Sequence, residues 1–490
     1  MPNLTKDDIR IVIETIKEVY LADKIPWICG YSGGKDSTAV VQLVWTALSQ
    51  LPKEKLHKPV HVISTDTLVE SPVVALWATR SIKRMEEAAN SPDKKLPIIP
   101  HRLVPEVKNT FWVNLIGRGY PYPRRDFRWC TDRMKIDPSN RFVKKILDAE
   151  SEAILVLGTR KAESATRKAV MEGYEKKRYR DHLSPNGSFP NSYVFTPIEN
   201  WSNDNVWQYL VQYPNPWGHS NKDLLAMYSG ASADGECPLV LDTSTPSCGN
   251  SRFGCWVCTM VSEDKSMAAM IQNDEEKAWM LPMLEFRNEI AATLEEDRKR
   301  RDFRRMDGRL TWYNGRLVHG PYTQETRQKF LKRLLQVEKL VHEIGPEEIK
   351  DVPLITMEEL RFIRQIWLDE KHEFEDLLPG IYESVTGKPY EDGIISKNKY
   401  FGPAEATLLY DACQSLYPDE TLIYEMQRSL LDIEAKAAAI SNKRNVIQNF
   451  EQEIKKSFYR DENEAATIAE ERAKKIAGMQ EAFDEENWTE

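Results

Sequence analysis

The stretch from Ile25 to Ser37 constrains the fold more than any other part of the chain. An apolar run of β-strand type, residues 25–31, leads directly into Ser32-Gly33-Gly34-Lys35-Asp36-Ser37. An amphipathic helix follows, and its apolar face carries Val40, Leu43, Val44, Ala47 and Leu48. Glycines let the backbone approach a phosphate, the free N–H groups of the first helical turn point at it, and Lys35 adds a positive charge. The stretch therefore predicts an anion-binding loop between a strand and a helix.

Two further strand-type runs continue this pattern. Residues 60–64 precede Asp66 and a helix expected to start at Ser71-Pro72, and residues 153–157 precede Gly158, Arg160 and Arg167. Alternating strands and helices predict an α/β fold, a parallel sheet with helices on both faces. The loops at the carboxyl ends of its strands should then converge. Asp66 suits a ribose hydroxyl, a magnesium ion or a helix cap, and the two arginines suit phosphates or the open surface.

Four of the seven cysteines fall in one short segment. They are spaced Cys237-x10-Cys248-x6-Cys255-x2-Cys258, with glycines close by. Four thiolates in a loop-rich segment fit either a tetrahedral zinc site or an iron-sulfur cluster, and the spacing alone does not choose between them.

The glycine loop resembles a known family. Its spacing is neither that of the Walker loop nor that of the dinucleotide-binding Gly-x-Gly-x-x-Gly motif. It resembles the PP-loop of the ATP pyrophosphatase superfamily, whose members split ATP between the α and β phosphates. The resemblance implies that Ser32, Gly33, Gly34, Lys35, Asp36 and Ser37 hold the pyrophosphate part of ATP, with Asp66, Arg160 and Arg167 near it. It also implies that Lys35 and Asp36 take part in catalysis and that magnesium bridges the phosphates.

Further motifs narrow the resemblance. Residues 128–131 (Arg-Trp-Cys-Thr), 158–167, 197–201 and 254–259 look like the phosphoadenosine phosphosulfate (PAPS) reductase branch of the superfamily. The clustered cysteines and the long charged extension are similar to the DndC family of sulfurtransferases, which act in bacterial DNA phosphorothioation. That likeness implies an adenine nucleotide α-hydrolase-like fold and a 4Fe-4S cluster held by Cys237, Cys248, Cys255 and Cys258. It implies as partners a cysteine desulfurase as sulfur donor, other phosphorothioation subunits, and DNA.

One departure from the reductase pattern concerns Cys130. Assimilatory reductases with a cluster have a Cys-Cys doublet upstream of the final Cys-x-x-Cys, whereas this chain has only Cys130 there. Cys130 and Cys29 are therefore candidates to carry a persulfide, and nearby arginines are expected to lower the pKa of the Cys130 thiol. For Cys29, a buried position in the strand is the favoured interpretation.

The sequence suggests four segments in its 490 residues. They are 1–230, the PP-loop domain; 231–265, the cysteine module; 266–460, a helical region able to bind DNA or a partner; and 461–490, an acidic tail expected to be disordered. Apolar residues between Ile423 and Ile454 recur at heptad-like steps, which fits pairing with a partner subunit or a helical hairpin within the chain. No run reaches the length of a membrane span and no signal peptide is evident, so we expect a cytoplasmic protein without a membrane partner.

Net charge does not exclude a nucleic-acid partner. The formal charge is −9, but the tail holds ten acids and three bases, a local −7, which leaves the rest near −2. Basic clusters at 124–128, 176–180 and 298–305 suit either phosphates or solvated helix faces.

The hypothesis that unites these observations is an ATP-dependent sulfurtransferase. It would adenylate a DNA backbone phosphate, release pyrophosphate, and replace a non-bridging oxygen with sulfur carried by Cys130 or delivered through the cluster. The alternatives are a PAPS reductase that releases sulfite, a tRNA thiolase, and a non-catalytic subunit that binds DNA under control of ATP.

Overall fold

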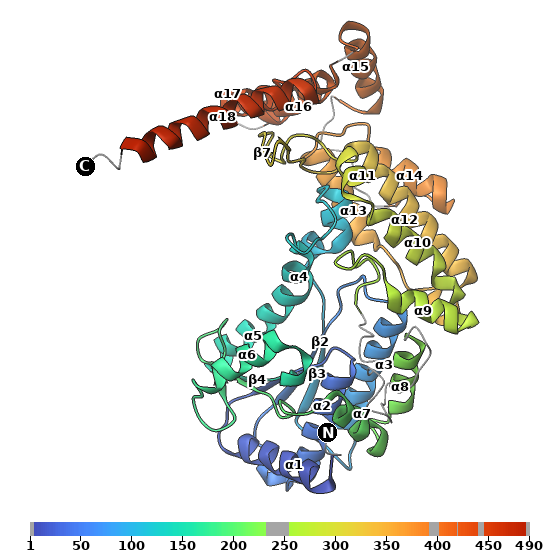
Figure 1. The fold of residues 1–490 in the computed structure, drawn as a ribbon. Helices are drawn as coiled ribbons and strands as arrows, with labels where there is room; N and C mark the ends of the chain where they lie inside the picture. The colour runs from blue at the N-terminus through green and yellow to red at the C-terminus, as the bar shows by residue number, and fades with distance from the viewer. Residues whose placement is uncertain (1–3, 232–253, 392–400, 419, 440–444, 487–490) are drawn as a thin grey trace. The chain divides into compact units, whose positions relative to one another are not determined.

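The chain folds into two compact units. A computed structural model describes residues 4–231, 254–391, 401–418, 420–439 and 445–486 (Figure 1). The sheet unit consists of Met1–Glu106, Pro123–Arg287 and Ile344–Val352. The helical unit consists of Val107–Tyr122, Asn288–Glu343 and Pro353–Glu490.

A mostly parallel sheet forms the centre of the sheet unit. Among the described residues its strands stand in the order β3-β2-β1-β4-β6-β5, and only β5 runs antiparallel, against β6. Trp27 in the central strand β1 pairs with Val60 on one side and with Ile154 on the other. The strands are β1 (Trp27–Gly30), β2 (Val60–Thr65), β3 (Ile98–Leu103), β4 (Ala153–Val156), β5 (Ser184–Pro185) and β6 (Ser192–Phe195). The predicted parallel α/β sheet is thus confirmed.

Helices cover both faces of this sheet because successive strand residues point to opposite sides. Trp27 and Cys29 belong to a large core with helices of one face, whereas Ile28 packs in a smaller core with Val143 of α5. The first face carries α1 (Lys6–Leu21), α2 (Lys35–Ser49), α3 (Pro72–Ala89), α7 (Asn203–Gln212) and α8 (Asn221–Gly230). The other face carries α5 (Asp137–Glu150). The remaining helices of the sheet unit are α4 (Trp129–Thr131), α6 (Ala165–Glu175), α9 (Lys265–Asn273) and α10 (Leu281–Ile290), whose last residues belong to the helical unit.

Helix starts follow the sequence signals. Thr5 and Asp8 form the capping box of α1, with the Asp8 amide donating to the Thr5 hydroxyl over 3.1 Å. Pro72 occupies the first turn of α3, where its missing N–H costs nothing. In contrast, α2 begins after Gly34, which offers no capping side chain, so the first turn of this helix keeps amides available to a ligand.

The helical unit is largely α-helical, as the sequence suggests. Its helices are α11 (Leu294–Lys299), α12 (Gln324–Ile344), α13 (Met357–Asp369), α14 (Leu377–Thr386), α15 (Pro403–Leu416), α16 (Thr421–Ala439), α17 (Val446–Lys456) and α18 (Glu462–Glu486). A short hairpin, β7 (Trp312–Tyr313) with β8 (Arg316–Leu317), lies between α11 and α12 in the chain. No helix in the described ranges combines the length and the apolarity needed to cross a bilayer.

Two expectations for the C-terminal residues need correction or refinement. Residues 462–486 form helix α18 rather than a disordered tail, because Ala465 and Ala469 bury themselves beside Leu317 of the hairpin. The heptad-like series is divided between α16 and α17, which pack on each other. Helix α17 begins after Asn445, which has φ +74°. Because α16 and α17 pack on each other, the hairpin alternative describes this region.

Candidate nucleotide-binding site

The loop from Ser32 to Ser37 joins the end of β1 to the start of α2. The Ser37 hydroxyl donates to the Gly34 carbonyl over 3.0 Å and accepts from the Ser32 amide over 3.2 Å. Trp77 of α3 donates its indole N–H to the Gly33 carbonyl over 3.0 Å. Gly33 itself has φ +75°, a left-handed conformation that a side chain would strain. These contacts hold the loop in one shape before any ligand arrives.

Charged side chains surround the loop. The Arg160 Nε donates to Asp36 Oδ1 over 2.7 Å, and the Lys35 ammonium lies 3.4 Å from Asp36 Oδ2. Arg160 is nearly buried, with 4 % of its side chain exposed, and it also donates to the Trp201 carbonyl. Arg160 follows β4 and the loop follows β1. The chain order changes direction between these two strands, and ligands of open α/β sheets bind at such a point.

This arrangement refines the expected role of two arginines. Arg160 lies at the loop and its Nε is bound to Asp36, so it orients that carboxylate, and its contact with a phosphate stays a prediction. Arg167 pairs with Glu163 over 2.7 Å on the exposed start of α6. The structure thus places Arg160 at the loop and pairs Arg167 with Glu163, four residues earlier in the chain.

Gly158, at the end of β4, is required by close packing. A Cβ at this position would lie 2.9 Å from the carbonyl carbon and oxygen of Asp36. Real Cβ atoms do not approach backbone atoms this closely, so a side chain here would push the first turn of α2 away from the sheet.

Gly158→Ala should therefore weaken ATP binding by about ten-fold and cost about 1–3 kcal/mol of stability. Isothermal titration with ATP and urea unfolding measure the two effects. Gly173→Ala is the matched control, because nothing lies within 4 Å of its Cβ on α6. Equal ATP affinities in the two alanine variants would contradict the close-packing argument.

Tyr228 of α8 also contacts the loop, and the sequence analysis did not predict this contact. Its hydroxyl accepts from the Lys35 amide over 3.4 Å, and its ring lies 5.4 Å from the Lys35 ammonium. Burial raises the pKa of Tyr228 to about 12, so the phenol is neutral. No sequence signal links a tyrosine on a distant helix to this loop.

Asp66 follows β2, the strand next to β1. It caps no helix: its Oδ1 accepts from the Leu68 amide over 2.9 Å and its Oδ2 lies 3.0 Å from Arg102. Burial and the Asp66 charge raise the pKa of nearby Glu70 to about 7. Asp66 therefore stands at the same edge of the sheet as the glycine loop, paired with an arginine of β3.

Two of the four clustered cysteines lie against this β2 loop. Cys255 and Cys258 form a turn in which the Cys258 amide donates to the Cys255 carbonyl over 2.9 Å. The Cys255 sulfur lies 3.4 Å from the Thr67 hydroxyl, and the Trp256 amide donates to the Val69 carbonyl. Burial raises the pKa of the Cys255 thiol to about 11.

Two cations lie at this cysteine turn, a buried arginine and an exposed lysine. Arg287 of α10 is fully buried and donates to the Cys258 carbonyl from two nitrogens, over 2.9 and 2.8 Å. Lys135 lies near Cys255, Glu70 and Cys258, whose negative charges raise the pKa of its ammonium. Neither residue carries a recognisable sequence signal.

Cys130 lies close enough to Cys258 for their charges to interact, but the expected pKa of its thiol was wrong in direction. Burial raises that pKa, with the nearby Cys258 adding to the rise, and the arginines close in sequence do not offset it. Cys29 is fully buried in β1 and burial raises its pKa to about 12, as its strand position predicted.

The structure describes two of the four cysteines that are predicted to hold the cluster. Cys237 and Cys248 lie outside the described residues. Among those described, no three His, Cys, Asp or Glu side chains are arranged to hold a metal ion. Cys255 and Cys258 fit a cluster in chemistry and spacing, since they are paired cysteines on one tight turn.

Comparisons with known proteins agree with this architecture. Residues 26–217 match the family model of the phosphoadenosine phosphosulfate reductase domain. Two uncharacterised proteins of Methanocaldococcus jannaschii are 28 % and 26 % identical over 211 and 180 residues, 42 % and 37 % of this chain. Those alignments cover 36 % and 34 % of the relatives, so the chain spans about a third of the length of the curated relatives it matches.

Solved structures give weaker likenesses. A PAPS reductase from Candida auris in complex with phosphate is 13 % identical, with a TM-score of 0.25, and covers 46 % of this chain and 92 % of its own. The U34-tRNA thiolase NcsA from Methanococcus maripaludis, with its 4Fe-4S cluster, is 16 % identical, with a TM-score of 0.27, and covers 43 % and 64 %.

The matched range begins one residue before β1 and contains the glycine loop, Asp66, Cys130, Gly158 and Arg160. Residues 26–217 are therefore similar to a PAPS reductase domain.

Proposed function

We propose that this protein is an ATP-dependent sulfurtransferase that places sulfur on the DNA backbone phosphate. One observation carries the proposal: a phosphate-type loop and a pair of cysteines meet the same edge of one sheet. The loop follows β1, and the turn holding Cys255 contacts Thr67 just after the adjacent strand β2. The loop that would bind the nucleotide and the cysteines that would handle sulfur thus follow or contact neighbouring strands of one sheet.

The first step is activation of the acceptor. A non-bridging phosphate oxygen attacks the α-phosphorus of ATP, the bond to the bridging α–β oxygen breaks, and pyrophosphate leaves. The amides at the start of α2 and the Lys35 ammonium stabilise the charge that develops on pyrophosphate. Asp36, held by Arg160, keeps Lys35 directed along the loop.

The second step replaces the activated oxygen. The terminal sulfur of a cysteine persulfide attacks the acceptor phosphorus and AMP leaves with the former phosphate oxygen. A second thiol then attacks the sulfur–sulfur bond, leaving sulfur on phosphorus and forming a disulfide that cellular thiols reduce. Cys130 is the proposed persulfide carrier, because it is half-buried and near Cys258. A cysteine desulfurase would supply the sulfur, and other phosphorothioation subunits would present the DNA.

The proposed cofactors are magnesium, bound with ATP, and a 4Fe-4S cluster. Magnesium binds proteins through few carboxylates and several phosphate or water oxygens, and Asp36 and Asp66 are each paired with an arginine. ATP phosphates would therefore supply most magnesium ligands. A 4Fe-4S cluster would be held by Cys255 and Cys258 together with Cys237 and Cys248, and it would supply a binding place for sulfur.

Mass spectrometry of nuclease-digested genomic DNA tests the acceptor. We expect phosphorothioate-linked dinucleotides in the source strain with the intact gene and none after its deletion or its replacement by the Cys130→Ser form. Linkages that persist after deletion would overturn the DNA assignment. Thionucleosides lost from tRNA in the deleted strain would instead identify tRNA as the acceptor.

Sulfonucleotide reduction is a second candidate, favoured by the family match of residues 26–217. That reaction releases sulfite and needs no cleavage between the α and β phosphates of ATP. Purified protein supplied with PAPS and a dithiol, or with ATP and DNA, separates the two. Sulfite from the first mixture supports reduction, and pyrophosphate from the second supports the sulfurtransferase.

A further inference from the structure

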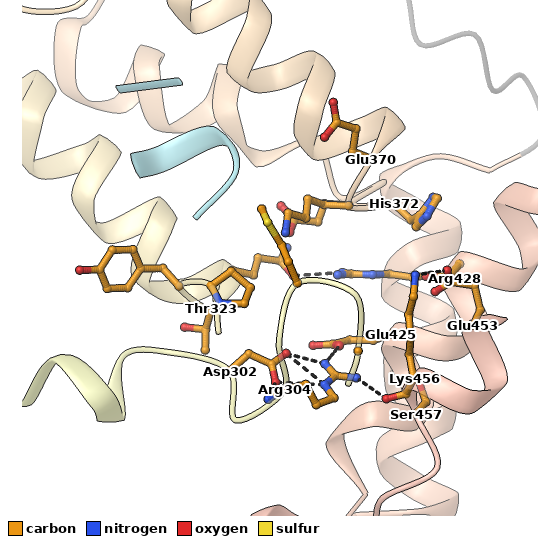
Figure 2. Close-up of a pocket in the computed structure, with 18 of the residues that line it drawn as sticks. Asp302, Arg304, Thr323, Glu370, His372, Glu425, Arg428, Glu453, Lys456 and Ser457 are labelled. Atoms are coloured by element: carbon orange, nitrogen blue, oxygen red, sulfur yellow. Dashed lines mark hydrogen bonds and ion pairs between the residues drawn. The ribbon is translucent and has the colours of Figure 1, made fainter. Parts of the chain in front are cut away.

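A charged cavity lies within the helical unit, and none of its lining residues belongs to the candidate nucleotide-binding site. Its volume is about 170 Å³, whereas one water molecule needs roughly 10–15 Å³ by the same measure. Its walls come from the loop at 302–308, the start of α12, the turn at 370–373, and helices α16 and α17. Figure 2 shows the labelled charged side chains of the loop and of these two helices around this space. The volume suits a small polyatomic ion.

The carboxylates of the cavity are largely used by cations of the same walls. Arg304 pairs with Asp302 over 2.6 Å and with Glu425 over 2.7 Å. Arg327 pairs with Glu373, and Lys456 lies 2.5 Å from Glu453. Glu370, the remaining acidic residue of the lining, is exposed to solvent. A cation would therefore find few free ligands here.

Two positive groups, in contrast, have unused donors. The Lys371 ammonium lines the cavity and makes no ion pair or hydrogen bond with any residue that the structure describes. Arg428 is 4 % exposed, and its Nε has no acceptor, although its Nη1 donates to Gln324 and Glu375. Unsatisfied buried donors are costly and rare in folded proteins. The buried Arg428 Nε therefore indicates that an acceptor is missing from the cavity.

The charged groups around Lys371 indicate that the missing ligand is an anion. Arg327 faces it from α12, and Glu373, Asp302 and Glu370 are the nearby acids. Burial and Arg327 lower the pKa of the ammonium to about 8 despite those acids. An anion placed beside Lys371 and Arg428 would satisfy both groups.

We propose that this cavity binds a phosphate-type oxyanion, with the Lys371 ammonium as its counter-charge and the Arg428 Nε–H as a directed donor. The hydroxyls of Thr323 and Ser457, which also line the cavity, can donate to further oxygens. The oxyanion is either free phosphate or a phosphate of a nucleic-acid backbone. The site is separate from the glycine loop and does not depend on the function proposed there.

Equilibrium dialysis with radiolabelled inorganic phosphate counts the sites on the full-length protein. We expect Lys371→Met to bind one phosphate fewer than the wild type, and Lys474→Met, a change of an exposed lysine on α18, to bind the same number. Methionine has a similar length to lysine, so folding is preserved. Binding that remains in Lys371→Met reports on the glycine loop, so failure at one site is distinguished from failure at the other.

A second variant and a competitor complete the test. Arg428→Lys keeps the charge but loses the Nε donor, so it should weaken phosphate binding at this site by about ten-fold. If a short DNA duplex displaces the phosphate from wild-type protein at micromolar concentration, the ligand is a backbone phosphate; if it does not, the ligand is the free ion. Unchanged phosphate binding in Lys371→Met overturns the proposal.

Discussion

Lys35→Met should reduce the rate of pyrophosphate release from ATP by about 10²–10³-fold, the loss expected when one charged donor to a leaving group is removed. The Lys35 side chain is 11 % exposed and lies beside Asp36 at the start of α2, where the helix offers uncapped amides. Because methionine keeps the length and the apolar stem, the change removes the charge and little else. A coupled pyrophosphate assay with DNA as acceptor measures the rate.

The control for this prediction is Lys53→Met, which changes an exposed lysine of the same unit far from the loop in sequence. It should leave the rate unchanged, and circular dichroism should show both variants folded. If Lys35→Met and Lys53→Met release pyrophosphate equally fast, the loop does not act on the leaving phosphates.

Arg327→Met should destabilise the helical unit by about 3–5 kcal/mol. Arg327 and Glu373 form an ion pair with side chains only 3 % and 4 % exposed. Removing the arginine leaves the Glu373 carboxylate buried without its partner. Urea unfolding measures the loss, followed by the fluorescence of Trp367, whose ring lies 5.3 Å from the Arg327 guanidinium.

The double variant Arg327→Met/Glu373→Leu should recover most of this stability, because both charges of the pair are then absent. Arg316→Met breaks an exposed pair with Glu295 and should leave the unfolding midpoint unchanged. A double variant no more stable than Arg327→Met alone would show that the arginine acts through packing and not through its charge.

Local sequence signals predicted the part of the fold that carries the loop. β1, β2 and β4 consist of short apolar runs followed by glycine or acidic residues, and these patterns need no knowledge of distant contacts. β3 was not predicted, since it contains Pro100, His101 and Arg102. It forms because β2 supplies a parallel partner along all six of its residues.

Electrostatic roles were harder to predict, because they depend on residues that are far apart in the sequence. The basic run 298–305 suited either phosphates or a solvated helix face, whereas Arg304 pairs with Asp302 and Glu425, and Arg298 with Glu462. Arg160 was expected near phosphate, and its bond to Asp36 could not be read from the sequence. The Cys130 pKa depends on burial, which the neighbouring arginines in the sequence do not reveal.

The interleaving of the two units has a consequence for how the protein can be divided. The chain passes from one unit to the other at 106/107, 122/123, 287/288, 343/344 and 352/353. Trp112, which belongs to the helical unit, is fully buried and donates its indole N–H to the Leu354 carbonyl over 2.7 Å. A fragment cut after residue 287 would keep the whole family-matched range, including Trp112, but would lack Leu354, which accepts the hydrogen bond of this buried indole. Residues 107–122 of the helical unit are inserted within the sequence of the sheet unit, so no single cut in the chain separates the two units.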